Sequence, residues 1–303
     1  MGVTPAPTRS VLRDASDVIV LMLGGIVLFV VTIWLALRTG AGARLDDDVV
    51  RSFAVDRFAP GRIESLLQEI RIPTMFVLTM LAVVVAAVQR YWRVALALPL
   101  LVVGANQTTQ VLKKDLLTSV PTDPSLSVTL PSGHSTAAIS LAAVAIIAAP
   151  RVLRPLVCLL AGSIAGGAGL GTMAERWHRP ADVVAAVAVV LIWSAVALLV
   201  GARWVEPPLV RPAGFDRAVG HSALATLGVA VGAYVLHRLG MGPMPGSKAT
   251  TLVYGSLAVV GVTIGLALGV IAVVADRRVF HVPRAHVIPP VAREQSLAVE
   301  GRS

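Results

Sequence analysis

The chain is poor in charged residues, cysteine and lysine. Only 14% of its 303 residues are charged and 56% are hydrophobic, whereas soluble domains carry about 25% charged residues. This composition excludes a water-soluble globular domain, a disordered chain and a coiled coil. Cys158 is the single cysteine, so a disulfide framework is excluded as well. Lysine supplies 3 of the 26 basic residues, and this usage, rich in Arg, Ala and Val, is typical of a high-GC genome.

Long apolar runs account for the composition. A helix needs roughly 20 residues to cross a hydrocarbon core of about 30 Å, and backbone at membrane depth must satisfy its hydrogen bonds internally. Eight stretches qualify, so the sequence predicts an all-α, polytopic membrane helix bundle. The first run is full length and no small-residue cleavage site follows it, so we expect no cleavable signal peptide. The predicted spans are 18–37, 72–89, 94–112, 134–150, 155–174, 182–202, 218–236 and 249–275.

The basic residues predict the orientation of the spans. With eight spans both termini lie on one side, which holds 14 basic and 7 acidic residues, against 12 and 10 on the other side. Because Lys and Arg are in excess in cytoplasmic loops, we expect both termini to be cytoplasmic. The net charge of +9 is interpreted through this topology, and no nucleic-acid partner is expected.

The segments outside the spans carry few signals. Residues 1–17 and 276–303 are predicted to be cytoplasmic tails, the second flexible because it has Pro and scattered charge without periodicity. Residues 38–71 form a predicted outer loop. Its Asp46–Asp48 run suggests either a metal site or a solvated acidic loop, and we favour the loop. A short amphipathic helix at the outer interface is permitted by Val55, Phe58, Ile63, Leu66, Leu67 and Ile70.

Three polar clusters stand beside span ends. Lys113 and Lys114 follow the run Asn106–Gln110 at the end of the third span, Pro131–His134 opens the fourth, and His178–Asp182 opens the sixth. Under the predicted topology all three lie on the outer side. Ionisable groups in a membrane bundle are costly to bury and mark functional sites, so we expect one site there. The run Asn106–Gln110 is interpreted as packing contacts between helices.

The residue types in these clusters suit phosphate chemistry. Ser132 and Gly133 precede a helix, whose N-terminal N–H groups and dipole favour an anion. His134 at the helix start is a candidate proton donor to a leaving oxygen. His178 and Asp182 are spaced i, i+4, so the carboxylate is able to fix the ring tautomer. An imidazole oriented in this way is a competent nucleophile.

These motifs resemble the type 2 phosphatidic acid phosphatase superfamily, whose soluble relatives include the vanadium haloperoxidases. Its pattern is K-x6-R-P, then P-S-G-H, then S-R-x5-H-x3-D; here P-S-G-H is intact at 131–134 and H-x3-D at 178–182. The resemblance implies a six-helix core over residues 18–202, with 203–275 adding two transmembrane helices, and it implies no metal or cofactor. By the same resemblance His178 attacks phosphorus, His134 protonates the leaving oxygen, Asp182 orients His178, and Lys113, Ser132 and Gly133 hold the phosphoryl oxygens.

Both arginines of the family pattern are replaced. Val120 and Thr172 stand at their positions, so two guanidinium groups that would bind the phosphoryl oxygens are absent. Losing one such donor costs about 3–4 kcal/mol of transition-state stabilisation. The basic residues close enough in sequence to replace them, and predicted to bind phosphate, are Lys114, Arg176 and Arg179.

The sequence therefore predicts a lipid phosphate phosphatase of a bacterial, actinobacterial plasma membrane. Its expected substrate is a lipid with a phosphate head group, either a polyprenyl (di)phosphate used in envelope assembly, which we favour, or a phosphatidate-type lipid. The alternative is a catalytically silent member of the fold that binds lipid or acts as a scaffold in a membrane complex. A second copy or a complex partner is expected at the last two helices. A transporter is disfavoured because the charged groups cluster at one end of the predicted bundle and not at the midplane of the bilayer.

Overall fold

A computed structural model describes residues 16–53, 65, 67–117, 130–201 and 214–278. Most of both predicted tails, and most of the predicted amphipathic helix between residues 55 and 70, lie outside these ranges. The regular structure of the described residues is helical, apart from one isolated bridge between Phe53 and Pro243.

A helix is found at each of the eight predicted spans, and the predicted all-α bundle is confirmed. Proline stands in the first turn of α5 and α8, where its missing N–H costs no helical hydrogen bond. The helices are α2 (Ser16–Ile33), continued by the π-helical turn η1 (Trp34–Arg38), α3 (Gly40–Ser52), α5 (Ile72–Val88), α6 (Trp92–Val111), continued by the π-helical turn η2 (Leu112–Leu116), α7 (Gly133–Ala148), α8 (Arg154–Ala174), α9 (Pro180–Gly201), α10 (Gly214–Arg238) and α11 (Ser247–Arg278).

Among the described residues, five helices are long and apolar enough to cross a membrane: α2 with η1, α6 with η2, α8, α9 and α11. Two further apolar helices, α5 and α7, are shorter, at 17 and 16 residues. Large apolar side chains such as Phe76 and Leu96 are exposed on the outside of the bundle. In a soluble protein such a surface would aggregate, whereas in a bilayer it contacts lipid. The chain is therefore a multi-pass membrane protein.

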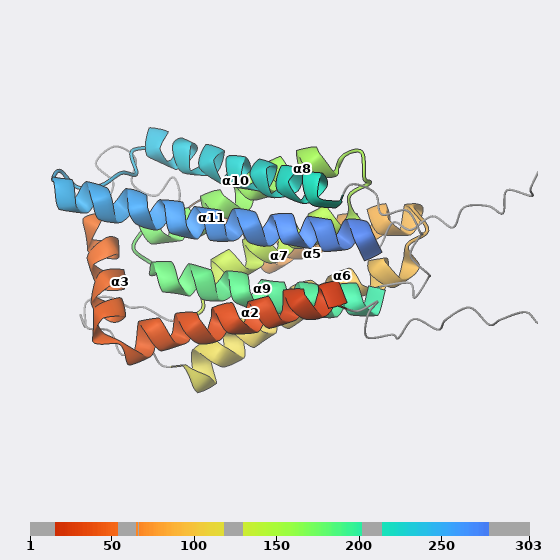
Figure 1. The fold of residues 1–303 in the computed structure, drawn as a ribbon, viewed down its shortest axis with the longest axis horizontal. Coiled ribbons are helices and arrows are strands. Elements are labelled where there is room, and N and C mark those ends of the chain that lie inside the picture. Colours follow the sequence, from red (N-terminus) through yellow and green to blue (C-terminus); the bar gives the residue numbers. More distant parts are fainter. Residues whose placement is uncertain (1–15, 54–64, 66, 118–129, 202–213, 279–303) are drawn as a thin grey trace, which may run out of the picture.

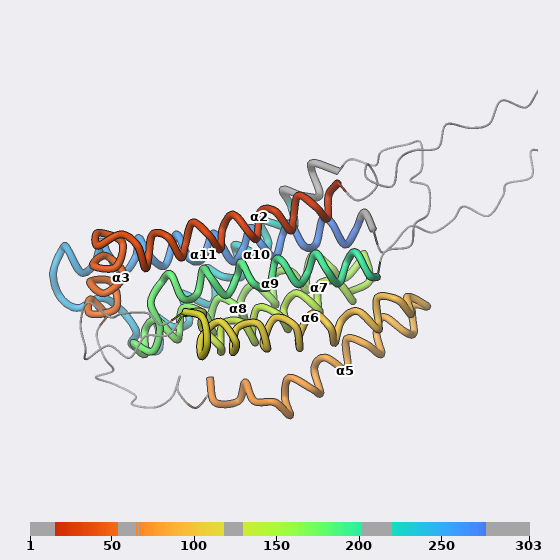
Figure 2. Tube along the Cα trace, turned by 90° about the horizontal axis from the view of Figure 1, so that it is seen from below, coloured from red at the N-terminus to blue at the C-terminus, as the bar shows by residue number. Residues whose placement is uncertain are grey.

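The long helices share one axis, and α3 lies across one end of the bundle (Figure 1). The start of α2 and the end of α11 lie together at the opposite end. An even number of crossings would place these two helix ends in this way. In the view from below, α5 lies at the edge of the bundle beside α6 (Figure 2).

The two C-terminal helices are packed into the same bundle. The helix α10 runs along α8 and α11, and α11 also contacts α7 and α9. Glycines permit this close approach: a Cβ at Gly228 would lie 2.1 Å from the carbonyl oxygen of Leu159, and one at Gly162 would lie 2.2 Å from that of Ala225. Small residues at helix contacts are the usual solution for packing in membranes.

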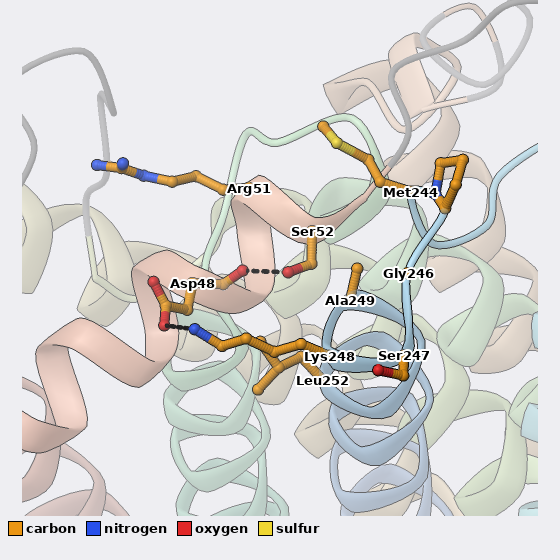
Figure 3. Close-up of a pocket in the computed structure, with 10 residues that line it drawn as sticks. Asp48, Arg51, Ser52, Met244, Gly246, Ser247, Lys248, Ala249 and Leu252 are labelled. Carbon is orange, nitrogen blue, oxygen red and sulfur yellow. Dashed lines mark hydrogen bonds and ion pairs between the residues drawn. The ribbon is translucent and has the colours of Figure 1, made fainter.

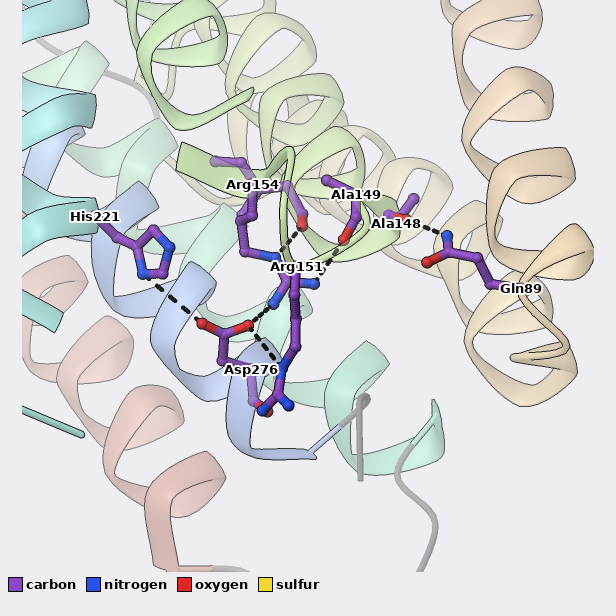
Figure 4. Close-up of polar contacts among 8 residues, drawn as sticks. Gln89, Ala148, Ala149, Arg151, Arg154, His221 and Asp276 are labelled. Atoms are coloured by element: carbon purple, nitrogen blue, oxygen red, sulfur yellow. Dashed lines mark hydrogen bonds and ion pairs between the residues drawn. The ribbon is translucent and has the colours of Figure 1, made fainter. Parts of the chain in front are cut away.

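A buried charged cluster joins α10 and α11 to the α7–α8 turn (Figure 4). Arg154 is fully buried and pairs with Asp276 of α11, and its Nη2 donates to the carbonyl oxygen of Ala149 at 2.8 Å. Arg151 Nη2 donates to the backbone oxygen of Asp276 at 3.0 Å, and Nδ1 of His221 in α10 lies 3.9 Å from Oδ2 of Asp276. The cluster ties the additional helices to the core at the end opposite α3.

The interpretation of Asp46–Asp48 as a solvated acidic loop is wrong. Residues 40–52 form the helix α3, whose N-terminus is capped by the Thr39 hydroxyl, 3.1 Å from the N–H of Gly42. Asp47 is 4% exposed. Because α3 lies against the end of the bundle, one side of the helix is buried and part of the acidic run is turned inward.

Candidate active site

The three polar clusters meet at the end of the bundle that α3 covers. The turn η2 ends α6 there, α7 begins there, and the connection from α8 to α9 passes there (Figure 1). The sequence placed these clusters on one side of the membrane, and the helices bring them to one end of the molecule.

His178 and Asp182 form a buried pair at the start of α9. Nδ1 of His178 lies 3.0 Å from Oδ2 of Asp182, which is 1% exposed. The same carboxylate oxygen accepts the backbone N–H of Arg179 at 3.2 Å. A carboxylate only accepts hydrogen bonds, so the contact selects the tautomer with the proton on Nδ1. Nε2 of His178 is then the nitrogen that carries a free lone pair.

Thr172 supports the turn that carries His178. Its carbonyl oxygen accepts the N–H groups of Trp177 at 3.0 Å and His178 at 3.1 Å, and its hydroxyl donates to the carbonyl oxygen of Gly169 at 2.8 Å. Arg176 has a left-handed φ of 58° within this turn. Thr172, which the sequence analysis placed at the position of the second family arginine, is thus a fully buried structural residue without positive charge.

Ser132 connects α7 to α9. Its hydroxyl caps α7, accepting from the N–H of Ser135 at 3.3 Å, and its own N–H donates to the carbonyl oxygen of Asp182 at 3.0 Å. Of the two amides expected to hold an anion, that of Ser132 is therefore already bonded within the protein. Beside it, a Cβ at Gly133 would lie 3.6 Å from Nε2 of Gln110.

His134 lies between the other clusters. Its ring centroid is 5.5 Å from that of Trp177, at an interplanar angle of 45°. It is within electrostatic reach of both His178 and Lys113. Lys113 is half-buried and Lys114 is exposed. Two imidazoles and one ammonium group, contributed by three separate segments, therefore gather at this end.

Arg176 and Arg179 both contact α3. Arg176 Nη2 donates to the carbonyl oxygens of Phe53 at 2.5 Å and Arg51 at 3.1 Å. Arg179 Nη2 lies 2.7 Å from Oδ1 of Asp47, and both side chains are buried. Phosphate binding by these arginines stays a prediction, and the contacts give each guanidinium group a structural role as well.

The sequence analysis missed the aspartates of α3 as part of this site. Besides the Asp47 contact, Asp46 lies near Asp182 and Arg179. Burial, followed by the charge of Asp182, raises the pKa of Asp46 to about 7. The available signal was three consecutive carboxylates, which must point in three directions if their segment is helical.

The polar run of α6 packs helices together, as interpreted. Asn106 Nδ2 lies 3.3 Å from the Ser140 hydroxyl, and the hydroxyls of Thr109 and Thr136 are 3.0 Å apart. Trp193 of α9 also donates to the Thr108 hydroxyl at 2.9 Å. These bonds fix the end of α6, and with it Lys113, relative to α7 and α9.

Val120, which the sequence analysis placed at the first family arginine position, lies outside the described residues.

The chain was compared with curated proteins, solved structures and models of protein families. The chain as a whole matches no curated protein and no solved structure. Lys113, the P-S-G-H motif and the His178–Asp182 pair all lie in residues 105–206, about a third of the chain. This segment matches the family model of the PAP2 superfamily, which confirms the resemblance seen in the sequence.

Proposed function

We propose that the protein is a membrane phosphatase that hydrolyses a lipid phosphate ester or diphosphate through a phosphohistidine. The observation that carries the proposal is the contact between His178 and Asp182, which leaves Nε2 as the free nitrogen. The match of residues 105–206 to the PAP2 superfamily supports it. In this proposal His178 is the nucleophile, His134 the general acid and Asp182 the orienting group.

The reaction takes two displacements at phosphorus. In the first, the Nε2 lone pair of His178 forms a bond to phosphorus, the bond from phosphorus to the leaving oxygen breaks, and protonated His134 gives its proton to that oxygen. In the second, water attacks phosphorus and loses a proton to neutral His134, and the P–N bond breaks. Inorganic phosphate leaves and both imidazoles return to their starting states.

The charge on the phosphoryl oxygens needs stabilisation. Lys113, Lys114, the N–H of Gly133 and the N-terminal dipole of α7 are the proposed donors. The amide of Ser132 contributes indirectly, because its bond to Asp182 fixes the start of α7 beside α9. Arg179 is adjacent to the nucleophile, and its Nε has no hydrogen-bond partner among the described residues. Of Arg176 and Arg179, Arg179 is therefore the better placed to replace one of the family's phosphate-binding arginines.

The proposed substrate has its apolar tail in the bilayer and its head group at the α3 end. A polyprenyl (di)phosphate is preferred over a phosphatidate. The excess of basic residues on the side predicted from the sequence to hold both termini supports a site on the extracytoplasmic face of a bacterial plasma membrane, with both termini cytoplasmic.

A catalytically silent, lipid-binding role is the second candidate. It is favoured by the buried Thr172 and by the contacts that α3 makes with Arg176 and Arg179. The two roles differ in phosphate release by the purified protein in lipid nanodiscs, supplied with polyprenyl diphosphate, polyprenyl phosphate and phosphatidate. Release that His178→Ala abolishes supports the enzyme. No release from any of the three supports the silent member.

A further inference from the structure

The helix α3 is fixed to the rest of the protein on two sides. Toward the site, Arg176 donates to the carbonyl oxygens of Arg51 and Phe53. Toward the C-terminal helices, the N–H of Met244 donates to the carbonyl oxygen of Ser52 at 2.8 Å. The chain between α10 and α11 thus holds α3 against the connection that carries His178.

Three consecutive aspartates of α3 have three different surroundings. Asp48 is half-exposed and pairs with Lys248 of α11 at 3.2 Å, beside an open cavity of about 460 Å³ between α3 and the α10–α11 connection (Figure 3). Asp47 is buried and contacts Arg179. Asp46 reaches the first turn of α9. Successive residues of a helix are about 100° apart, so one short helix serves three neighbours.

The contact between Asp47 and Arg179 has a direct path to the nucleophile. Arg179 follows His178 in the chain, and its backbone N–H donates to the carboxylate oxygen that also binds the His178 ring. Breaking a buried ion pair from one side leaves an uncompensated charge, which is strongly destabilising. Asp47 therefore restrains the backbone on which the His178–Asp182 contact depends.

We propose that Asp47 is a positioning residue of the active site, through which α3 sets the geometry of the His178–Asp182 pair. The inference rests on the proposed function for its effect on turnover. Asp47 acts through its charge, so neither Ala nor Asn should replace it. Asp48 pairs with Lys248 of α11 and supplies a control from the same helix.

The test compares Asp47→Ala, Asp47→Asn and Asp48→Ala in nanodiscs. Two quantities are measured: phosphate release from polyprenyl diphosphate, and the ¹⁵N chemical shifts of the His178 ring, assigned with His178→Gln. We expect both Asp47 variants to lower kcat tenfold or more with little change in KM, and to reduce the population of the Nδ1–H tautomer. Asp48→Ala should stay within about twofold of wild type.

The two readouts separate this inference from the proposed function. If the wild type releases no phosphate but the Asp47 variants still change the His178 tautomer, the function is wrong and the positioning role stands. If the wild type is active and the tautomer and rate of Asp47→Ala match those of Asp48→Ala, the positioning role is overturned. Should Asp47→Ala not fold, Asp47→Leu with Arg179→Met removes both buried charges, and an unchanged tautomer in that variant overturns the role equally.

Discussion

Oδ2 of Asp182 lies 3.0 Å from Nδ1 of His178 and also accepts the backbone N–H of Arg179. One oxygen thus fixes both the ring of the proposed nucleophile and the backbone beside it. In Asp182→Asn an amide group can face the ring, and it favours the opposite tautomer. We expect phosphate release to fall by about 10²–10⁴-fold. Asp115→Asn, which changes an exposed carboxylate, is the control and should behave as wild type; equal activity of the two variants contradicts the orienting role.

Asp46 should make stability depend on pH. Its pKa is raised from 3.8 to about 7, first by burial and then by the charge of Asp182, with Asp47 acting in the same direction and Arg179 opposing. Between these values the folded protein keeps a proton that the unfolded chain has lost, so stability falls as pH rises and then levels off above about pH 7. Asp46→Asn has no ionisable group at this position, so its free energy of unfolding does not fall in this way as pH rises. Its advantage over wild type should be absent near pH 4 and reach on the order of 1–4 kcal/mol above pH 7.

Thermal unfolding of the two proteins in detergent at several pH values, followed by tryptophan fluorescence, measures this difference. An advantage of Asp46→Asn that is constant with pH, or larger at low pH, contradicts the titration of Asp46 in the folded state.

The buried charges at the opposite end should contribute to stability. Arg154→Met leaves the carboxylate of Asp276 without its fully buried partner, and breaking such a pair costs about 3–5 kcal/mol. Arg151→Gln removes a partly exposed charge from the same carboxylate and should cost less than about 1 kcal/mol. Unfolding of both variants in detergent gives the comparison. Equal losses would mean that Arg154 is not the main partner of Asp276.

The contact between α8 and α10 should not accept a methyl group. A Cβ at Gly228 would lie 2.1 Å from the carbonyl oxygen of Leu159, whereas one at Gly255 in α11 meets nothing within 4 Å. We therefore expect Gly228→Ala to lower the free energy of unfolding by about 1–3 kcal/mol, because the helices must separate. Gly255→Ala should be neutral or stabilising, since Ala favours helix by up to about 1 kcal/mol. A neutral Gly228→Ala would show that the two helices are not in close contact.

The sequence predicted the helices of the bundle well. Each span is set by its own length and apolar content, which are local properties, so helix positions agree from 16–38 to 247–278. The sequence also placed His134 and His178 at the same end, because alternate crossings fix the side on which each connection lies. The spacing of His178 and Asp182 on one helical turn predicted their contact for the same local reason.

The residues around that pair were not predictable in this way. Whether Asp47 is buried depends on α3 lying across the end of the bundle, which is a tertiary contact. Its partner Arg179 is far away in the sequence, and no spacing rule connects them. The close packing of α10 on α8 likewise depends on glycines of both helices meeting in register. These contacts decide how the site is held together, and they became visible only with the structure.

The most direct test of the central claim is to trap the phosphohistidine. Wild-type protein in nanodiscs is mixed briefly with a lipid diphosphate labelled with ³²P and quenched in base, in which phosphohistidine survives, and the labelled residue is then located by mass spectrometry. The account predicts phosphate on His178 in the wild type, and neither label nor phosphate release in His178→Ala. Phosphate release that persists in His178→Ala, or that proceeds with the label on another residue, would contradict it.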